Sequence, residues 1–116
     1  MLRERVLELA RFAADAAADK KANDVVILDI ANLSVLADYF IICSGNSNTQ
    51  VQAIAGGVVE KMEKRGVHKK AMEGYDEARW ILVDFGDVVV HVFRAEEREF
   101  YNLERVWGDA PQLSVV

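Results

Sequence analysis

Residues 79–93 read RWILVDFGDVVVHVF, two runs of β-branched and aromatic residues separated by Gly86-Asp87. A two-residue connection of this kind predicts a tight β-hairpin. The register that follows gives one wholly apolar face, made of three facing pairs: Ile81 with Val92, Val83 with Val90, and Phe85 with Val88. The opposite face mixes apolar and polar side chains: Trp80, Leu82, Asp84, Val89, His91 and Phe93. We expect the first face to lie in the core, because a strand that alternates in this way buries one side.

Helical and β patterns alternate along the rest of the chain. Runs of β-branched and aromatic residues predict strands at three further places: residues 25–29, residues 39–43 and, as a weak edge strand, residues 67–72. Apolar residues at helical spacing predict three helices: residues 2–18, Ser47 to just before Gly66, and residues 96–107, the last with Phe100, Leu103 and Trp107 on one stripe. In the middle helix, Ser47 and Gln50 have the spacing of a capping box, and Gly66 suits the position after the last turn.

This order of elements predicts the α/β (α+β) class, with a mixed sheet of about five strands packed by helices. The strand, turn and helix over residues 39–62 imply a right-handed crossover to a parallel neighbouring strand. We expect a single domain over residues 1–116, since this length suits one hydrophobic core.

The composition is that of a globular protein, with 52% apolar residues, one proline and one cysteine, Cys43. One cysteine allows no intramolecular disulfide and no CxxC pair, which favours a reducing compartment. The N-terminus lacks the apolar block of a signal peptide, and no run approaches the roughly 18 apolar residues that span a bilayer. We therefore expect a cytoplasmic protein with no membrane partner.

The charge is unevenly distributed. Residues 1–72 carry ten Lys/Arg and nine Asp/Glu, a net of +1, whereas residues 73–116 carry four and ten, a net of −6. A total of −5 argues against a general nucleic-acid binder and against direct sequence-specific contact with nucleic acid. The acidic C-terminal part suggests either attraction to a basic partner or a solubilising surface.

The loop Ser44-Gly45-Asn46-Ser47 joins a strand to a helix, where free N–H groups can bind phosphate. It is neither a P-loop nor a three-glycine dinucleotide motif, so a tight turn with a helix cap is the competing interpretation. Nucleotidyltransferases place a similar turn there, followed about ten residues later by paired strand carboxylates that hold magnesium. The matching segment here, residues 56–60, lies inside the predicted helix, and no Asp-x-Asp strand follows. We assign no catalytic residue, metal or cofactor.

His91 and Trp80 each allow a functional and a structural interpretation. His91 lies diagonal to Asp84 in the hairpin register, and the two could form an acid–base unit or a structural pair. Two histidines without cysteine partners argue against a zinc site.

Trp80 stands beside the acidic segment 73–77, and tryptophans often dominate the binding energy of an interface. From the residues alone, Trp80 is either an interface residue or a core residue beneath a helix.

Several segments together resemble the ribosomal silencing factor family, also called the Iojap-like family. They are ADYFIICSGNS (residues 37–47), QVQAIA (50–55), Glu73-Gly74, WILVDFGDVVVHVF (80–93), Arg98, Phe100 to Glu104, and Trp107. The resemblance covers about residues 2 to 110 in order. Each segment is weak evidence by itself, but the ordered set is specific.

The resemblance implies a fold related to nucleotidyltransferases but without their catalytic carboxylates, and a protein that is not an enzyme. It implies binding to the large ribosomal subunit through the fourteenth protein of that subunit, which keeps the small subunit from joining and represses translation. By matched position, the implied docking residues are Glu73, Gly74, Trp80, Ile81, Asp84 and Tyr101. Trp80 would be the apolar anchor, and Glu73 and Asp84 would face basic groups.

Two alternatives remain open from the sequence. The chain could be a divergent nucleotide-binding or nucleotidyltransferase-like enzyme that uses the loop at residues 44–47. It could also be a homodimer with Trp80 at the self-interface, which is compatible with ribosome binding if binding dissociates the dimer.

Overall fold

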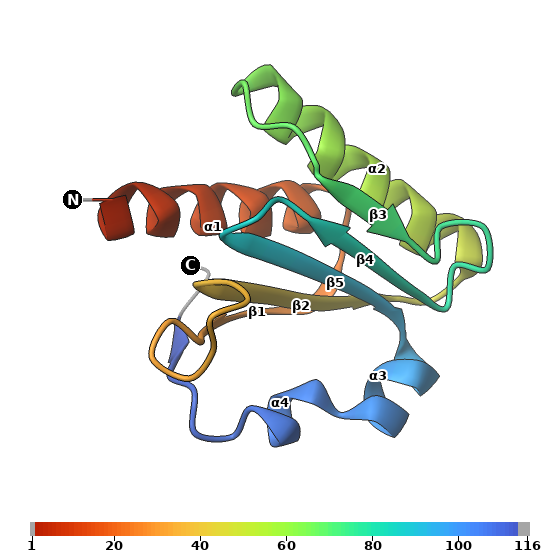
Figure 1. The fold of residues 1–116 in the computed structure, drawn as a ribbon. Coiled ribbons are helices and arrows are strands. Elements are labelled where there is room, and N and C mark those ends of the chain that lie inside the picture. The colour runs from red at the N-terminus through yellow and green to blue at the C-terminus, as the bar shows by residue number, and fades with distance from the viewer. Residues whose placement is uncertain (1, 114–116) are drawn as a thin grey trace.

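The computed structural model describes residues 2–113. Its helices are α1 (Leu2–Asp19), α2 (Asn48–Lys64), α3 (Ala95–Tyr101) and α4 (Leu103–Val106). Its strands are β1 (Asn23–Asp29), β2 (Tyr39–Gly45), β3 (Ala71–Glu73), β4 (Trp80–Asp84), β5 (Val88–Arg94) and β6 (Gln112–Leu113). The strands form one mixed sheet in the order β3-β4-β5-β2-β1-β6 (Figure 1). The α+β class is confirmed, with six strands in place of about five.

The hairpin prediction is confirmed in detail. Strands β4 and β5 pair antiparallel, with Ile81 opposite Val92 and Val83 opposite Val90. At the turn, the Phe85 N–H donates to the Val88 carbonyl at 2.9 Å. Gly86 has a φ of +96°, a conformation that glycine adopts without steric cost. The predicted parallel neighbour is also present, because β2 pairs parallel with β5 along its whole length.

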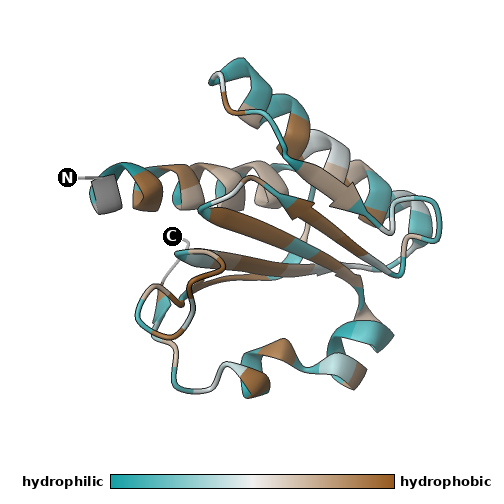
Figure 2. Ribbon diagram, in the orientation of Figure 1, coloured by the Kyte–Doolittle hydropathy of each residue, from teal (hydrophilic) through white to brown (hydrophobic). Residues whose placement is uncertain are grey.

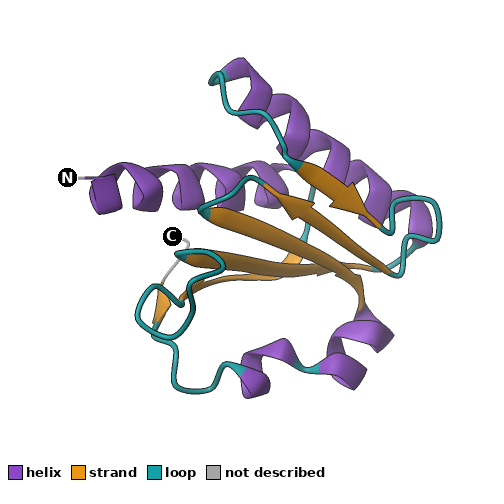
Figure 3. Cartoon of the chain, in the orientation of Figure 1, coloured by secondary structure: helices purple, strands orange, loops and turns teal. Residues whose placement is uncertain are grey.

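Two layers of helices cover the sheet, one on each side (Figure 3). The long helices α1 and α2 cover one face, where they enclose the larger apolar core with the inward side chains of β2, β4 and β5. The short helices α3 and α4 lie on the other side of the sheet. There a smaller cluster joins buried residues of the strands with Ile30, Ala37 and Ala110 of the connecting segments. Figure 2 shows hydrophobic residues concentrated along the central strands.

Helix α2 begins and ends as its sequence predicts. The Ser47 Oγ accepts the Gln50 N–H at 3.1 Å, which caps the first turn. The Gln50 side chain accepts the N–H of Asn46, so the capping box closes one residue earlier than expected. After the last turn Gly66 has a φ of +80°, and the Val67 N–H donates to the Met62 carbonyl. This is the Schellman arrangement that glycine favours.

Three predictions about the chain outside the hairpin were inaccurate. The helix predicted over residues 96–107 is two helices, because Asn102 adopts a left-handed conformation with a φ of +47°. The break turns Phe100 outward, and its side chain is 80% exposed instead of buried. The edge strand is β3 at residues 71–73, shorter and later than residues 67–72. A sixth strand, β6, pairs with β1 and was not predicted.

No helix within residues 2–113 is both long and apolar enough to cross a bilayer.

Candidate functional site

An aromatic cluster lies on the sheet face that α3 and α4 cover. Trp80 of β4 and Phe93 of β5 are directly opposite in the hairpin, and their rings stack with centroids 4.9 Å apart. Tyr101, at the end of α3, lies 4.8 Å from Trp80 by ring centroids. Phe93 is fully buried, Trp80 is half-buried and Tyr101 is 45% exposed. The cluster therefore runs from the core to the surface, and Trp80 and Tyr101 form its outer part.

Gly74 brings the β3–β4 loop against Trp80. Its φ is +81°, and a Cβ built at this position would lie 2.2 Å from the Trp80 carbonyl oxygen. No side chain fits there without moving the backbone, so glycine is required for this close approach. The loop returns through a hydrogen bond from the Ala78 N–H to the Gly74 carbonyl at 2.9 Å.

Two hollows flank Trp80. The first, of about 250 Å³, is lined by Gly74, Glu77, Arg79, Trp80, Glu97 and Tyr101. The second, of about 270 Å³, is lined by Glu73, Gly74, Trp80 and Leu82. In the first hollow Glu97 lies 3.7 Å from the guanidinium of Arg79, which is largely exposed. Trp80 thus forms a ridge between two concave surfaces, with carboxylates at the edges of both.

The structure brings together four of the six docking residues implied by the resemblance: Glu73, Gly74, Trp80 and Tyr101. Asp84 lies further along β4 on the same face as Trp80, and its Oδ1 accepts the Gly86 N–H at 2.7 Å. It therefore stabilises the hairpin turn. The Ile81 side chain is 0% exposed and lies in the larger core on the opposite face. In this structure that side chain is not part of the surface around Trp80.

The expected pair of Asp84 and His91 is not formed. His91 bonds to Trp80 instead: the indole Nε1–H donates to the imidazole Nδ1 at 3.2 Å. His91 is 4% exposed, and this burial lowers the pKa of its imidazole to about 4, because the charged form loses its hydration. The imidazole lies among aromatic rings, and within residues 2–113 no hydrogen bond or ion pair joins a carboxylate to it.

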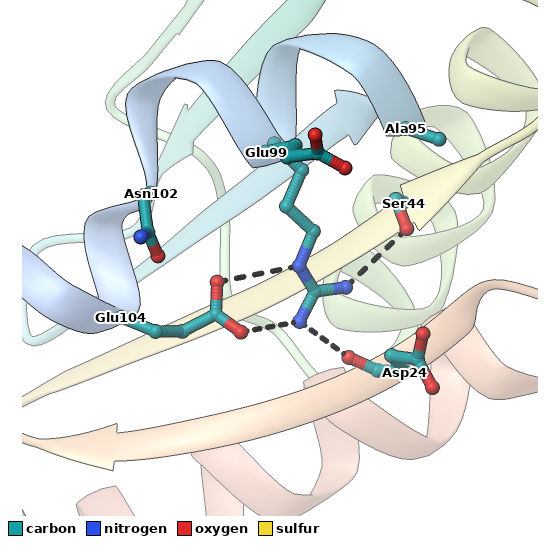
Figure 4. Close-up of a pocket in the computed structure, with 7 residues that line it drawn as sticks. Asp24, Ser44, Ala95, Glu99, Asn102 and Glu104 are labelled. Atoms are coloured by element: carbon teal, nitrogen blue, oxygen red, sulfur yellow. Dashed lines mark hydrogen bonds and ion pairs between the residues drawn. The ribbon is translucent and has the colours of Figure 1, made fainter.

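Arg98 of α3 ties the short helices to the sheet through hydrogen bonds to β1 and β2. Figure 4 labels three of its partners, Asp24, Ser44 and Glu104. Its Nε and one terminal nitrogen bind both carboxylate oxygens of Glu104, at 3.3 and 2.9 Å. The two terminal nitrogens also donate to the carbonyls of Asn23 and Asp24, at 3.1 and 2.8 Å. One of them reaches the Ser44 Oγ at 3.3 Å. The loop considered for nucleotide binding thus meets an arginine whose donors are already bound by protein groups.

Within residues 2–113, no group of three or more His, Cys, Asp or Glu side chains is arranged to hold a metal ion. Residues 56–60 lie inside α2, as expected. The thiol of Cys43 is buried in β2, and burial raises its pKa to about 12, so it is not a thiolate nucleophile at neutral pH.

Sequence reasoning missed several residues that shape this site: Leu82, Glu77, Arg79 and Glu97 in the hollows, and His91 beneath Trp80. A signal existed for three of them. Leu82 and His91 share the mixed hairpin face with Trp80, and Glu77 belongs to the acidic segment beside it. Glu97 carried none, because only the fold of α3 back beneath the sheet brings it near β4.

Comparison with known proteins finds a matching family model, similar sequences and similar solved structures. The family model described as "Ribosomal silencing factor during starvation" matches residues 3–116. "Ribosomal silencing factor RsfS" of Bacillus subtilis (strain 168) is 55% identical over 111 residues, which cover 96% of this chain and 92% of that protein. A crystal structure of a Chromobacterium violaceum protein superposes with a TM-score of 0.87 at 39% identity, covering 89% of this chain and 86% of that one.

A second crystal structure, of a protein from Bacillus halodurans, superposes with a TM-score of 0.81 at 46% identity and covers 96% of this chain and 98% of that one. The match to the family model extends over nearly all residues, and the similarity in sequence is accompanied by the same fold. The chain therefore belongs to the ribosomal silencing factor family.

Proposed function

We propose that this chain represses translation by binding the large ribosomal subunit through the fourteenth protein of that subunit, so that the small subunit cannot join. Membership of the ribosomal silencing factor family supports action on the ribosome. The observation that carries the contact surface is the half-buried Trp80 ridge, with Tyr101 beside it and a hollow on each side. Aromatic residues in such settings supply much of the binding energy of protein interfaces.

The charge around Trp80 suits a basic protein partner. Glu77, Glu97 and Arg79 line one hollow, which leaves it one net negative charge, and Glu73 lines the other. Residues 73–116 as a whole carry a net charge of −6. Proteins that bind ribosomal RNA need Lys and Arg to neutralise phosphates, so they present basic surfaces. Complementary charge accelerates the encounter and fixes the orientation of the docked partner.

The proposed mechanism is steric, and no covalent bond is made or broken. The described part of the protein measures 38 × 32 × 26 Å along its principal axes. A body of this size, held on the face of the large subunit that the small subunit must approach, would occupy volume that the small subunit needs. Repression would then last as long as the factor stays bound.

The proposal is tested by co-sedimentation of the purified protein with separated ribosomal subunits, followed by a subunit-joining assay. We expect binding to the large subunit alone and fewer joined ribosomes in proportion to the amount bound. Large subunits lacking the fourteenth protein should not bind the factor. Binding without any effect on joining would contradict the steric mechanism.

Trp80→Ala is the matching variant, and Trp107→Ala is its control. Both tryptophans are half-buried and pack against the same smaller apolar cluster, so Trp107→Ala tests whether removing any indole from this side of the sheet weakens binding. Trp80→Ala should weaken binding to the large subunit by about 2 kcal/mol or more, roughly thirtyfold. Trp107→Ala should bind normally at a temperature where circular dichroism shows that both variants are folded. Equal binding by the two variants would remove Trp80 from the interface.

Sedimentation of the same variants over a range of protein concentrations tests self-association. Loss of a dimer in Trp80→Ala alone would place Trp80 in a self-interface as well.

A further inference from the structure

The hydrogen bond between Trp80 and His91 has a fixed direction. An indole nitrogen carries a hydrogen and has no lone pair in the ring plane, so it can only donate. The imidazole Nδ1, 3.2 Å away, must therefore accept, which requires an unprotonated Nδ1. In the neutral ring the hydrogen then lies on Nε2. A protonated imidazole would place two donors against each other.

Among residues 2–113, the His91 ring makes no polar contact other than the one with Trp80. Its neighbours are the rings of Phe40, at 4.6 Å between centroids, and of Phe93, at 6.3 Å. Its Nε2 is buried without a hydrogen-bond partner among the described residues. A buried N–H without a partner costs free energy, so an apolar side chain would suit this pocket better. What histidine adds here is the acceptor for Trp80.

We infer that His91 is a positioning residue for the docking surface, which holds the Trp80 indole by its N–H so that the outer part of the ring is presented to the partner in one orientation. The inference rests on the proposed role of Trp80 in binding. The low pKa of His91 is consistent with it, since a neutral ring at physiological pH keeps Nδ1 free to accept.

This arrangement specifies the chemistry that the partner must supply. Because the indole N–H points to His91, it is not available to a carbonyl or carboxylate of the partner. The partner can contact the carbon atoms of the Trp80 ring only with apolar groups or with a cation above the ring face. Holding the ring before docking also spares the loss of side-chain freedom that ordering it in the complex would require.

The first experiment reads the hydrogen bond in the free protein. Nitrogen NMR of the wild type should show the His91 hydrogen on Nε2 and slow solvent exchange of the Trp80 indole N–H. A hydrogen on Nδ1 would overturn the inference, and so would rapid exchange of that indole N–H. This measurement needs no variant and no ribosome.

The second experiment uses His91→Asn and His91→Leu, two side chains of similar size and branching. The Asn amide oxygen can take the place of Nδ1 as acceptor, whereas Leu cannot accept. We expect His91→Leu to weaken binding to the large subunit by about tenfold, the loss of roughly one hydrogen bond, and His91→Asn to restore most of it. Both variants are measured below their unfolding temperatures.

Trp80→Phe supplies the double-mutant cycle that separates positioning from general packing. Phenylalanine has no N–H, so in this background the Asn and Leu variants should bind equally well. A difference that persists in the Trp80→Phe background would show that His91 acts through something else, and the inference would fall.

The outcomes also separate this inference from the proposed function. If Trp80→Ala weakens binding but His91→Asn and His91→Leu behave alike, the docking surface stands and the positioning role is overturned. If Trp80→Ala binds normally, the docking surface and the positioning role are both overturned, whereas binding to the large subunit itself stands. If the wild type does not bind the large subunit, the proposed function is overturned. If the Leu variant does not fold, the NMR measurement on the wild type still decides the matter, because a positioned indole predicts slow exchange whatever happens to that variant.

Discussion

The two faces of the sheet are built from alternate residues of the same strands, yet they are covered very differently. On one face, α1 and α2 bury valine, isoleucine, alanine and methionine side chains in a continuous core. On the other, α3 and α4 contribute no fully buried residue and are held to the sheet by Arg98. Apolar burial without polar groups provides stability at the first face. The second face leaves aromatic rings partly exposed, which suits recognition.

Substitution of two neighbouring residues of β4, Ile81 and Trp80, should give the largest difference in stability between the two faces. Ile81→Ala should lower the free energy of unfolding by about 4 kcal/mol, because it leaves a cavity in a fully buried site. Trp80→Ala, on the other face, should cost about half as much, since its ring is partly solvated. Urea unfolding of the two variants measures both values. Equal costs would mean that the second face contributes to the core as much as the first.

Ile81→Ala should also leave ribosome binding unchanged whenever the variant is folded, because its side chain does not reach the surface. A loss of binding by folded Ile81→Ala would instead support the place of Ile81 among the docking residues.

Lowering the pH should give the next largest change in the free energy of unfolding. The pKa of His91 is about 4 in the folded protein, below its ordinary value, because burial opposes the charged form. Between roughly pH 6.5 and 4 the unfolded chain therefore binds a proton that the folded chain does not, and stability falls as the pH falls, by roughly 3 kcal/mol. The stability that His91 contributes is fully present above about pH 6.5.

The control for this titration is His91→Asn, which cannot titrate. Urea unfolding of both proteins across this pH range should show the wild type losing more stability on acidification. Parallel curves would contradict a neutral buried imidazole.

The smallest expected change in stability is confined to the second face, where Arg98 binds Glu104. Arg98→Lys keeps the charge but loses the two-pronged contact with Glu104, because a lysine cannot bind both carboxylate oxygens in the same plane. We expect about 1 kcal/mol of destabilisation, confined to the second face. Hydrogen exchange should become faster in residues 95–106 and stay unchanged in α2. If hydrogen exchange became faster by the same factor in residues 95–106 and in α2, the second face would not open separately from the first.

Local patterns predicted the first face well. The Gly86-Asp87 turn sets the hairpin register, and the alternation of β4 and β5 then determines which side chains enter the core. Ser47 and Gly66 likewise mark the ends of α2, because caps are recognised by bonds within a few residues. Each of these signals lies within a short stretch of chain.

The structure of the second face depends on contacts that a single stretch of sequence does not determine. His91 has two diagonal neighbours on β4, Trp80 and Asp84, and the sequence does not say which one it contacts. The structure resolves this because the Asp84 carboxylate is taken by the turn N–H of Gly86. Asn102 breaks a segment with continuous helical spacing by adopting a left-handed conformation, which exposes Phe100. Strand β6 exists only by pairing with β1, far away in sequence.

The pairing of β5 with β4 and β2 also predicts an order of folding events. The β4–β5 hairpin closes a two-residue turn and already contains Trp80, His91 and Phe93, so it can form early. Strand β2, which carries Phe40 against His91, is separated from β5 in the sequence by α2, β3 and β4, so we expect their pairing to be slower and less local. Until then the future docking surface is an exposed aromatic hairpin with a free edge, a form that favours aggregation. The side chains that we propose for recognition in the folded protein are therefore also exposed in that early hairpin.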